Sequence, residues 1–214
     1  TADGALNEMT DIMQRMKDLA TQSANGTNSD ADRNSMQTEY DELGKELGNI
    51  MANTSFAGEK LFSKDGTSGK FGAEVSFQIG ATKDETLALN VSGSVSALAS
   101  GIGDISESYT SSTLGTEITS VSGAQDMIDK LTGALDKVGE LRGQFGANIN
   151  RLNHTANNLA NIKDNTEMAR GRIMDADFAS ESAMMSKNSM LMQSGISMLK
   201  QTGQMPSMVM SLLG

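Results

Sequence analysis

The sequence of 214 residues contains no cysteine and no tryptophan, one proline, one histidine and 4% aromatic residues. Without cysteine there can be no disulfides, thiolate metal sites or cysteine nucleophiles. So few aromatic side chains argue against a compact, aromatic-rich enzyme and favour helices packed in long layers. The single histidine, His154, stands in an Asn-rich helical stretch, where we expect a surface or structural role rather than a catalytic one.

Positive charge is also scarce. There are 17 Lys and Arg against 27 Asp and Glu, which gives a formal net charge of -10. No basic stripe could neutralise phosphates, so the composition argues against nucleic acid as a partner. The chain has no run of 18 apolar residues and no signal peptide at its start, so we expect no membrane partner. It begins without Met on a helical pattern, and we expect it to have been cut from a longer protein.

Motifs of the common enzyme classes are missing as well. The sequence has no HExxH, no GxxxxGK[ST] and no GxSxG, so metallopeptidase, P-loop and hydrolase chemistry lack their usual support. Methionine thioethers can bind Cu(I), but a copper site would also require nearby His or Cys, which the methionine-rich end lacks. We therefore predict a protein that is not an enzyme, with no cofactor and no metal.

Two amphipathic helical patterns open the sequence. Asn25-Gly26 separates them, and Thr27 or Ser29 can cap the second, with Asp30 following. These patterns predict helices over residues 2–24 and 29–53. The apolar stripes consist of Leu6, Met9, Met13, Met16 and Ala20 in the first helix and of Met36, Tyr40, Leu43, Leu47 and Ile50 in the second.

The period changes to two between residues 70 and 92. Apolar residues alternate with small or polar ones on both sides of the turn ATKDE, which predicts a β-hairpin with one apolar face. Such a hairpin cannot stand alone and must lie on the helices. Residues 93–123 are rich in Ser, Gly and Thr, and we expect a loop or exposed edge there, with at most a short helix around residues 96–102.

A helical period returns at residue 124 and predicts a long helix over residues 124–172, of the kind found in bundles and coiled coils. The end of the chain, residues 179–214, is rich in methionine and repeats apolar residues at intervals of seven. It predicts an amphipathic helical tail interrupted by Gly195, Gly203 and Pro206. A membrane-surface helix is the competing interpretation, but the tail has too few lysines to attract anionic lipid strongly.

These patterns together predict a mainly α fold, in which long antiparallel helices form a rod-like bundle with one β-hairpin packed on it. We divide the chain into a helical rod domain, residues 1–178, and a carboxyl-terminal helical segment, residues 179–214.

Four stretches, in this order, resemble one family. They are GALNEMTDIMQRMKDLATQSANGTNS, FQIGA, LRGQFGANINRLNHTANNLANIKDN with ARGRIMDADFASE, and MLKQTGQMPSMVMSLLG. The chain resembles bacterial flagellin, the subunit of the flagellar filament, over essentially its whole length. The resemblance implies a member truncated at the amino end and with little or no variable outer domain, since the middle of the chain is short.

The resemblance also implies partners and a location. Family members assemble with other flagellin subunits through helical coiled-coil termini, and they are exported through the flagellar type III apparatus to the extracellular filament. Before export, a cytoplasmic chaperone binds the carboxyl-terminal tail. Apolar residues expected to bind the chaperone or the filament core are Met184, Met185, Leu191, Met192, Ile196, Met198, Leu199, Met205, Met208, Val209, Leu212 and Leu213.

A further expectation concerns innate immunity. The stretch QRMKDLATQ, with a glutamate on the next helix, is similar to the family motif that a vertebrate Toll-like receptor reads. It maps onto Arg15, Leu19 and Glu39. Arg offers a bidentate cation and Leu an apolar contact.

The leading hypothesis is thus a structural filament subunit that serves motility. The alternative is a non-flagellar exported helical protein, such as an adhesin or a needle-tip-like binding module. Assembly of filaments from seeds distinguishes the two.

Overall fold

The computed structural model describes residues 1–80, 82–110 and 114–210; for residues 175–177 and 205–210 it describes the backbone alone. The chain divides into two compact units, unit 1 (Thr1–Ala156) and unit 2 (Asn157–Gly214). This division falls earlier than the predicted boundary after residue 178. The cause is that long-range packing ends near residue 156, although the helix itself continues.

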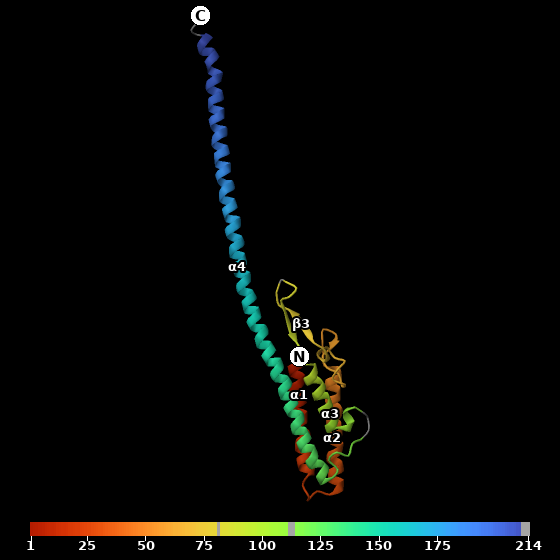
Figure 1. Cartoon of the computed structure of the whole chain (residues 1–214). Helices are drawn as coiled ribbons and strands as arrows, with labels where there is room; N and C mark the ends of the chain where they lie inside the picture. Colours follow the sequence, from red (N-terminus) through yellow and green to blue (C-terminus); the bar gives the residue numbers. More distant parts are fainter. Residues whose placement is uncertain (81, 111–113, 211–214) are drawn as a thin grey trace. The chain divides into compact units, whose positions relative to one another are not determined.

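Unit 1 is a bundle of helices that run alternately in opposite directions (Figure 1). Its helices are α1 (Ala2–Ser23), α2 (Asp30–Asn53), α3 (Ser92–Ile105) and the first part of α4 (Val121–Met210). An ion pair of 2.9 Å between Asp3 and Arg142 joins the start of α1 to α4, and the Ser23 hydroxyl at the other end of α1 donates to the Ile118 carbonyl just before α4. These contacts confirm the predicted antiparallel helical fold.

The core of unit 1 follows the sequence stripes. All five predicted stripe residues of α1 are fully buried, as are Tyr40 and Leu47 of α2. From α4 the core receives Leu131, Val138 and Leu141. Burying a large apolar side chain stabilises the fold by about 1.5–3 kcal/mol relative to leaving it in water, so these stripes hold the bundle together.

The link between α1 and α2 is fixed by a capping box and by a buried arginine. Ser29 Oγ accepts from the Asp32 amide at 3.2 Å, and the Ser29 amide donates to the Asp32 carboxylate at 3.1 Å. The Ser29 hydroxyl also donates to the Asp32 carboxylate at 2.7 Å, and this bond, together with the one from the Ser29 amide, lowers the pKa of Asp32. The Arg33 guanidinium donates to the carbonyl oxygens of Ser23, Asn25 and Asn28, so one side chain satisfies three turn carbonyls.

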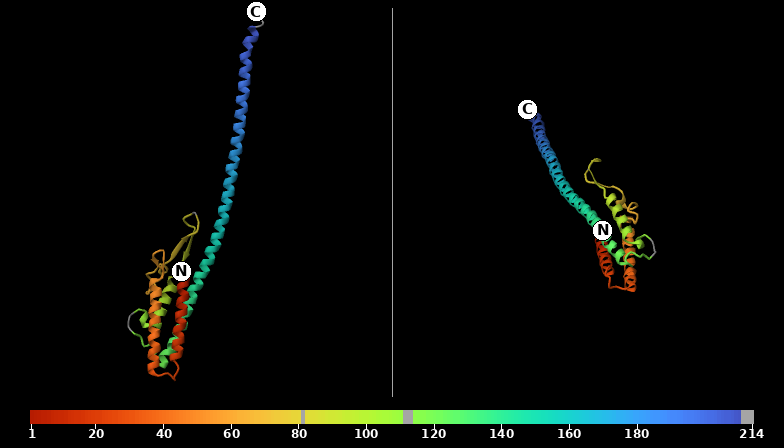
Figure 2. Two further views of the ribbon diagram at one scale, coloured as in Figure 1. Left: turned by 180° about the vertical axis from the view of Figure 1, so that it is seen from behind. Right: turned by 60° about the horizontal axis from the view of Figure 1, so that its bottom comes forward.

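Two small antiparallel hairpins follow α2. The first, β1 (Ser55–Phe56) with β2 (Glu59–Lys60), turns through Gly58 at a φ of +86° and is absent from the sequence prediction. The second, β3 (Val75–Gln78) with β4 (Thr86–Leu89), is the predicted hairpin in shorter form. Its register pairs Val75 with Leu89 and Phe77 with Leu87, which places the alternating apolar residues on one face. Lys70–Gly72 forms the short 3-10 helix η1 instead of extending the strand. Figure 2 shows this second hairpin at the end of the bundle where α1 begins.

The expectation of a loop or exposed edge in residues 93–123 is wrong in its first half. Helix α3 begins at Ser92 and continues to Ile105, longer than the short helix expected around residues 96–102. Val95, Leu98, Ile102 and Ile105 are fully buried. Their spacing of three, four and three residues forms an apolar stripe, which outweighs the high Gly and Ser content.

A buried carboxylate holds the segment after α3 against α2. Asp41 is only 1% exposed. Its Oδ1 accepts from Gln37 Nε2 at 2.9 Å, from Ser108 Oγ at 3.1 Å and from the Gly115 amide at 3.1 Å. Beside it, the Ile118 amide donates to Gln37 Oε1 at 2.8 Å. This cluster, which we call the Asp41 network, connects residues that lie up to 81 positions apart in the sequence.

Helix α4 does not end at residue 172 as predicted, and it continues into the segment that was predicted to form a separate tail helix. It runs from Val121 to Met210 and includes Gly195, Gly203 and Pro206. Residues 172–194 contain neither Gly nor Pro, so nothing there breaks the helix. The two glycines weaken the helix without ending it.

Candidate assembly surface

Unit 2 presents a helix whose apolar side chains are exposed. Outside residues 175–177, every residue between 157 and 204 except Gly171 is exposed. The large apolar side chains among them are Leu159, Ile162, Met168, Ile173, Met174, Phe178, Met184, Met185, Met190, Leu191, Met192, Ile196, Met198 and Leu199. A large exposed apolar patch on a helix indicates a surface for a partner.

Most of these side chains gather on one side of the helix. With 3.6 residues per turn, those between residues 173 and 199 fall within an arc of about 160°, apart from Met190. We call this set the apolar face; it consists of Ile173, Met174, Phe178, Met184, Met185, Leu191, Met192, Ile196, Met198 and Leu199. Met190 and Gln193 lie on the opposite side. The one-sided pattern is typical of a helix that packs against another helix.

Seven of the predicted tail residues belong to this face, and the other five lie outside the residues whose side chains the structure describes. Met184, Met185, Leu191, Met192, Ile196, Met198 and Leu199 belong to it. The side chains of Met205, Met208 and Val209 and all of Leu212 and Leu213 lie outside the described residues. Ile173, Met174 and Phe178 extend the face beyond the predicted set. They precede Leu191, Met192 and Ile196, respectively, by 18 residues, which is five helical turns, and this spacing is the signal that could have found them.

The residues predicted for a receptor surface lie in two different environments. Arg15 and Glu39 lie on the surface of α1 and α2 and form an ion pair, with Arg15 Nη2 at 2.6 Å from Glu39 Oε1 and Arg15 Nε at 2.8 Å from the same oxygen. Leu19, by contrast, is only 2% exposed and belongs to the core of unit 1, next to Ala20 of the apolar stripe of α1.

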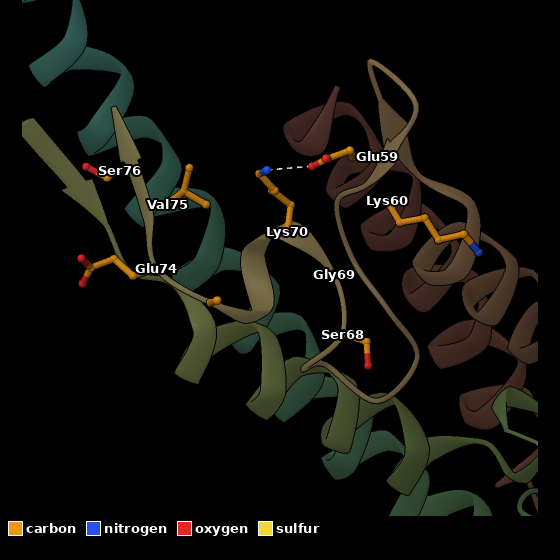
Figure 3. A pocket seen from close by; sticks show the side chains of 9 residues that line it. Glu59, Lys60, Ser68, Gly69, Lys70, Glu74, Val75 and Ser76 are labelled. Carbon is orange, nitrogen blue, oxygen red and sulfur yellow. Dashed lines mark hydrogen bonds and ion pairs between the residues drawn. The ribbon is translucent and has the colours of Figure 1, made fainter. Parts of the chain in front are cut away.

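A cavity in unit 1 lies between the two hairpins. It has a volume of about 650 Å³ and is lined by residues 59–60, 68–70 and 73–76. Figure 3 shows Lys70 reaching across to Glu59, with which it forms an ion pair of 2.7 Å. This hydrogen-bonded pair lowers the pKa of Glu59, which keeps the carboxylate charged and unsuited to proton transfer near neutral pH.

A second, smaller cavity of about 210 Å³ is apolar. Phe71, Phe77, Leu89 and Phe145 line it, and the rings of Phe71 and Phe145 meet edge to face at 4.9 Å. It is the seam where the β3–β4 hairpin packs on α4.

The structure shows no metal-binding cluster in the parts of the chain that it covers. Among these residues no group of three or more His, Asp or Glu side chains is placed to hold a metal ion. No helix within the same ranges is long and apolar enough to span a membrane.

Comparison with known proteins agrees with the helical ends of the chain. Residues 1–67 match the model of the bacterial flagellin N-terminal helical region, and residues 126–213 match that of the bacterial flagellin C-terminal helical region. Flagellin A of Vibrio anguillarum is 33% identical over 308 aligned positions, which cover 100% of this chain and 80% of the relative. Polar flagellin C of Vibrio parahaemolyticus is 31% identical with the same coverage.

A solved structure shows the same architecture. The crystal structure of Bacillus cereus flagellin matches with a TM-score of 0.56 and 31% identity, covering 73% of this chain and 81% of that one. The alignment with Flagellin A runs over 308 positions whereas this chain has 214 residues. The relative therefore carries segments that this chain lacks.

Proposed function

The chain belongs to the bacterial flagellin family, and we propose that it packs against neighbouring subunits of the flagellar filament through the apolar face of unit 2. As a flagellin it is a structural subunit of the filament, not an enzyme, and it assembles with other flagellin subunits outside the cell. The observation that carries the proposal is the apolar face itself, from Ile173 to Leu199, exposed on a helix that the C-terminal flagellin model matches.

The physical case rests on the cost of leaving this face in water. Each large apolar side chain that becomes buried contributes about 1.5–3 kcal/mol, so a few such residues suffice to favour association. A lone helix is marginal in water, whereas one that buries an apolar stripe against another helix is stabilised by that packing.

Seeded polymerisation tests the proposal with a matched pair of variants. Leu191→Glu places a charge in the apolar face, whereas Gln193→Glu places the same charge on the opposite side of the helix. We expect protein expressed from its complete gene to extend filament seeds, Gln193→Glu to do so as well, and Leu191→Glu to fail while its helix content by circular dichroism stays unchanged. Equal polymerisation by both variants would refute the assignment of the face.

The finer proposal is that an export chaperone covers the same face before the chain leaves the cell through the flagellar type III apparatus. Methionine supports this reading, because its flexible thioether adapts to different partner surfaces. Amide hydrogen exchange tests it: residues 183–210 should exchange quickly in the free protein and slowly after the cognate chaperone is added. Slow exchange without any partner would overturn it.

A second candidate function is recognition by a Toll-like receptor through the Arg15–Glu39 pair. The exposed ion pair places a guanidinium, which can bind a carboxylate through two donors, on the surface of two adjacent helices. Arg15→Ala should weaken receptor signalling without loss of helix content, with Arg151→Ala on α4 as the control. Unchanged signalling by Arg15→Ala would remove the pair from the site.

The comparisons do not favour the alternative of a non-flagellar adhesin or needle-tip-like module, for which failure to polymerise while folded would be the supporting result.

A further inference from the structure

The methionines of this chain occupy two opposite environments. Seven of the fourteen large apolar side chains exposed between residues 157 and 204 are methionines, and the exposed fractions of these methionines range from 56% to 72%. In unit 1, by contrast, Met9, Met13, Met16 and Met51 are fully buried. Oxidation of a thioether requires access to its sulfur, so the two groups should react very differently.

We propose that the exposed methionines of unit 2 are a reversible oxidation site that controls whether the apolar face can pack against a partner. The control of packing rests on the function proposed above, whereas the site itself does not. Hydrogen peroxide transfers one oxygen atom to the sulfur: the O–O bond breaks, an S–O bond forms, methionine is oxidised to its sulfoxide and the peroxide is reduced to water. A thiol-dependent sulfoxide reductase reverses the change, with two thiols oxidised to a disulfide and the oxygen released as water.

The composition of the chain directs peroxide to these side chains. Cysteine, the other common target, is absent from the sequence, and so is tryptophan. No thiolate therefore competes for the oxidant, and no disulfide can form within the chain. Accessible methionines are the side chains left to react.

Position around the helix decides what the sulfoxide does. Met192 lies in the apolar face, so its sulfoxide would have to leave water when the face packs, and burying a polar group without a hydrogen-bond partner is unfavourable. Met190, two residues away, lies on the opposite side and is as exposed as Met192, at 72% against 68%. Its sulfoxide would stay in water. The same chemistry thus has opposite consequences at two neighbouring sites.

The site is tested first by its reaction rates. The chain is treated with dilute hydrogen peroxide, and sulfoxide at each methionine is followed by peptide mass spectrometry. We expect oxidation at Met190 and Met192 to be faster than at Met9 and Met51 by on the order of tenfold or more. Comparable rates at all four positions would overturn the oxidation site.

The control of packing is tested by seeded polymerisation of variants in the complete protein. Glutamine mimics the polarity of the sulfoxide, so Met192→Gln should lose extension by at least tenfold, whereas Met190→Gln should extend seeds like the unmodified protein. Relative to its own rate without peroxide, Met192→Leu should lose less extension after peroxide treatment than the unmodified protein does. Equal extension by the two glutamine variants would overturn the control, and so would failure of the unmodified protein to polymerise. That last failure refutes the proposed function, and the measured oxidation rates still decide the site.

Discussion

The Asp41 network gives the sharpest test of how unit 1 is held together. Asp41→Ala removes the acceptor that lies between α2 and the segment after α3. The buried Gly115 amide then loses its partner, because the Asp41 carboxylate is its only recorded acceptor among the described residues. Gln37 Nε2 keeps a second acceptor, Glu117 at 2.6 Å. A buried unsatisfied amide costs about 1–3 kcal/mol, and the lost hydrogen bonds to a charged group add to that. We expect the free energy of unfolding to fall by about 2–4 kcal/mol.

Asp41→Asn is the matched control, because three donors among the described residues converge on one carboxylate oxygen. Among the described residues, Gln37, Ser108 and Gly115 all donate to Oδ1, and Oδ2 receives the longer contact of 3.3 Å from the Gly115 amide. An asparagine that places its carbonyl oxygen at Oδ1 keeps all three shorter bonds. It loses the charge and converts the longer contact into a repulsive one, so the expected loss is about 1 kcal/mol.

Tyrosine fluorescence during urea unfolding measures these changes. The chain has no tryptophan and only two tyrosines, and both Tyr40 and Tyr109 are buried in unit 1. The signal therefore reports unit 1 alone. The dependence of the free energy on urea concentration should be the same for the variants and the unmodified protein, so that midpoint shifts report stability. A loss below about 1 kcal/mol for Asp41→Ala, or an equal loss for Asp41→Asn, would refute the reasoning.

Two further predictions concern the loop before η1. Gly66 has a φ of +71°, and an added Cβ would lie 2.7 Å from Ser96 Cα, so Gly66→Ala should destabilise unit 1 by about 1–3 kcal/mol. Gly133 lies in open space on α4, so Gly133→Ala should instead stabilise unit 1 slightly. The reverse order of the two variants in urea unfolding would contradict this prediction. The side chains of Ser63 and Ser68 and the amides of Thr67 and Ser68 donate to Asp65 and hold its pKa well below the ordinary value of 3.8. A carboxylate whose pKa is lowered in the folded state stabilises the fold at pH values above the ordinary pKa, and this stabilisation is lost as the pH falls below it. The loss of stability between pH 6 and pH 3 should therefore be smaller in Asp65→Asn than in the unmodified protein. An unchanged loss would disprove the contribution of Asp65.

The sequence predicted the helical stripes because they depend on local spacing. The five apolar positions of α1 repeat at three and four residues, and all of them are buried. The stripe of α3 has the same spacing, but its high Gly and Ser content is typical of a loop, so composition and periodicity point in opposite directions there.

The contacts that fix the rest could not be read from local patterns. The Asp41 network joins α2 to residues more than 65 positions away in the sequence, and nothing near Asp41 distinguishes it from a surface acid. The same limit applies to the candidate sites. The exposed apolar face follows from period and composition, whereas the burial of Leu19 depends on how α1 lies in the bundle.

The division into a packed unit 1 and an exposed unit 2 has a calorimetric consequence. The heat capacity of unfolding comes chiefly from apolar surface that becomes exposed, and unit 2 already exposes its apolar side chains. The unassembled chain should therefore unfold with a heat capacity change of about 2 kcal/mol/K, as expected for the 156 residues of unit 1, instead of the roughly 2.8 kcal/mol/K expected for all 214. The difference should appear as a negative heat capacity change when subunits join, because the apolar side chains of unit 2 are buried in that step. A calorimeter would therefore detect this burial during assembly and not during folding.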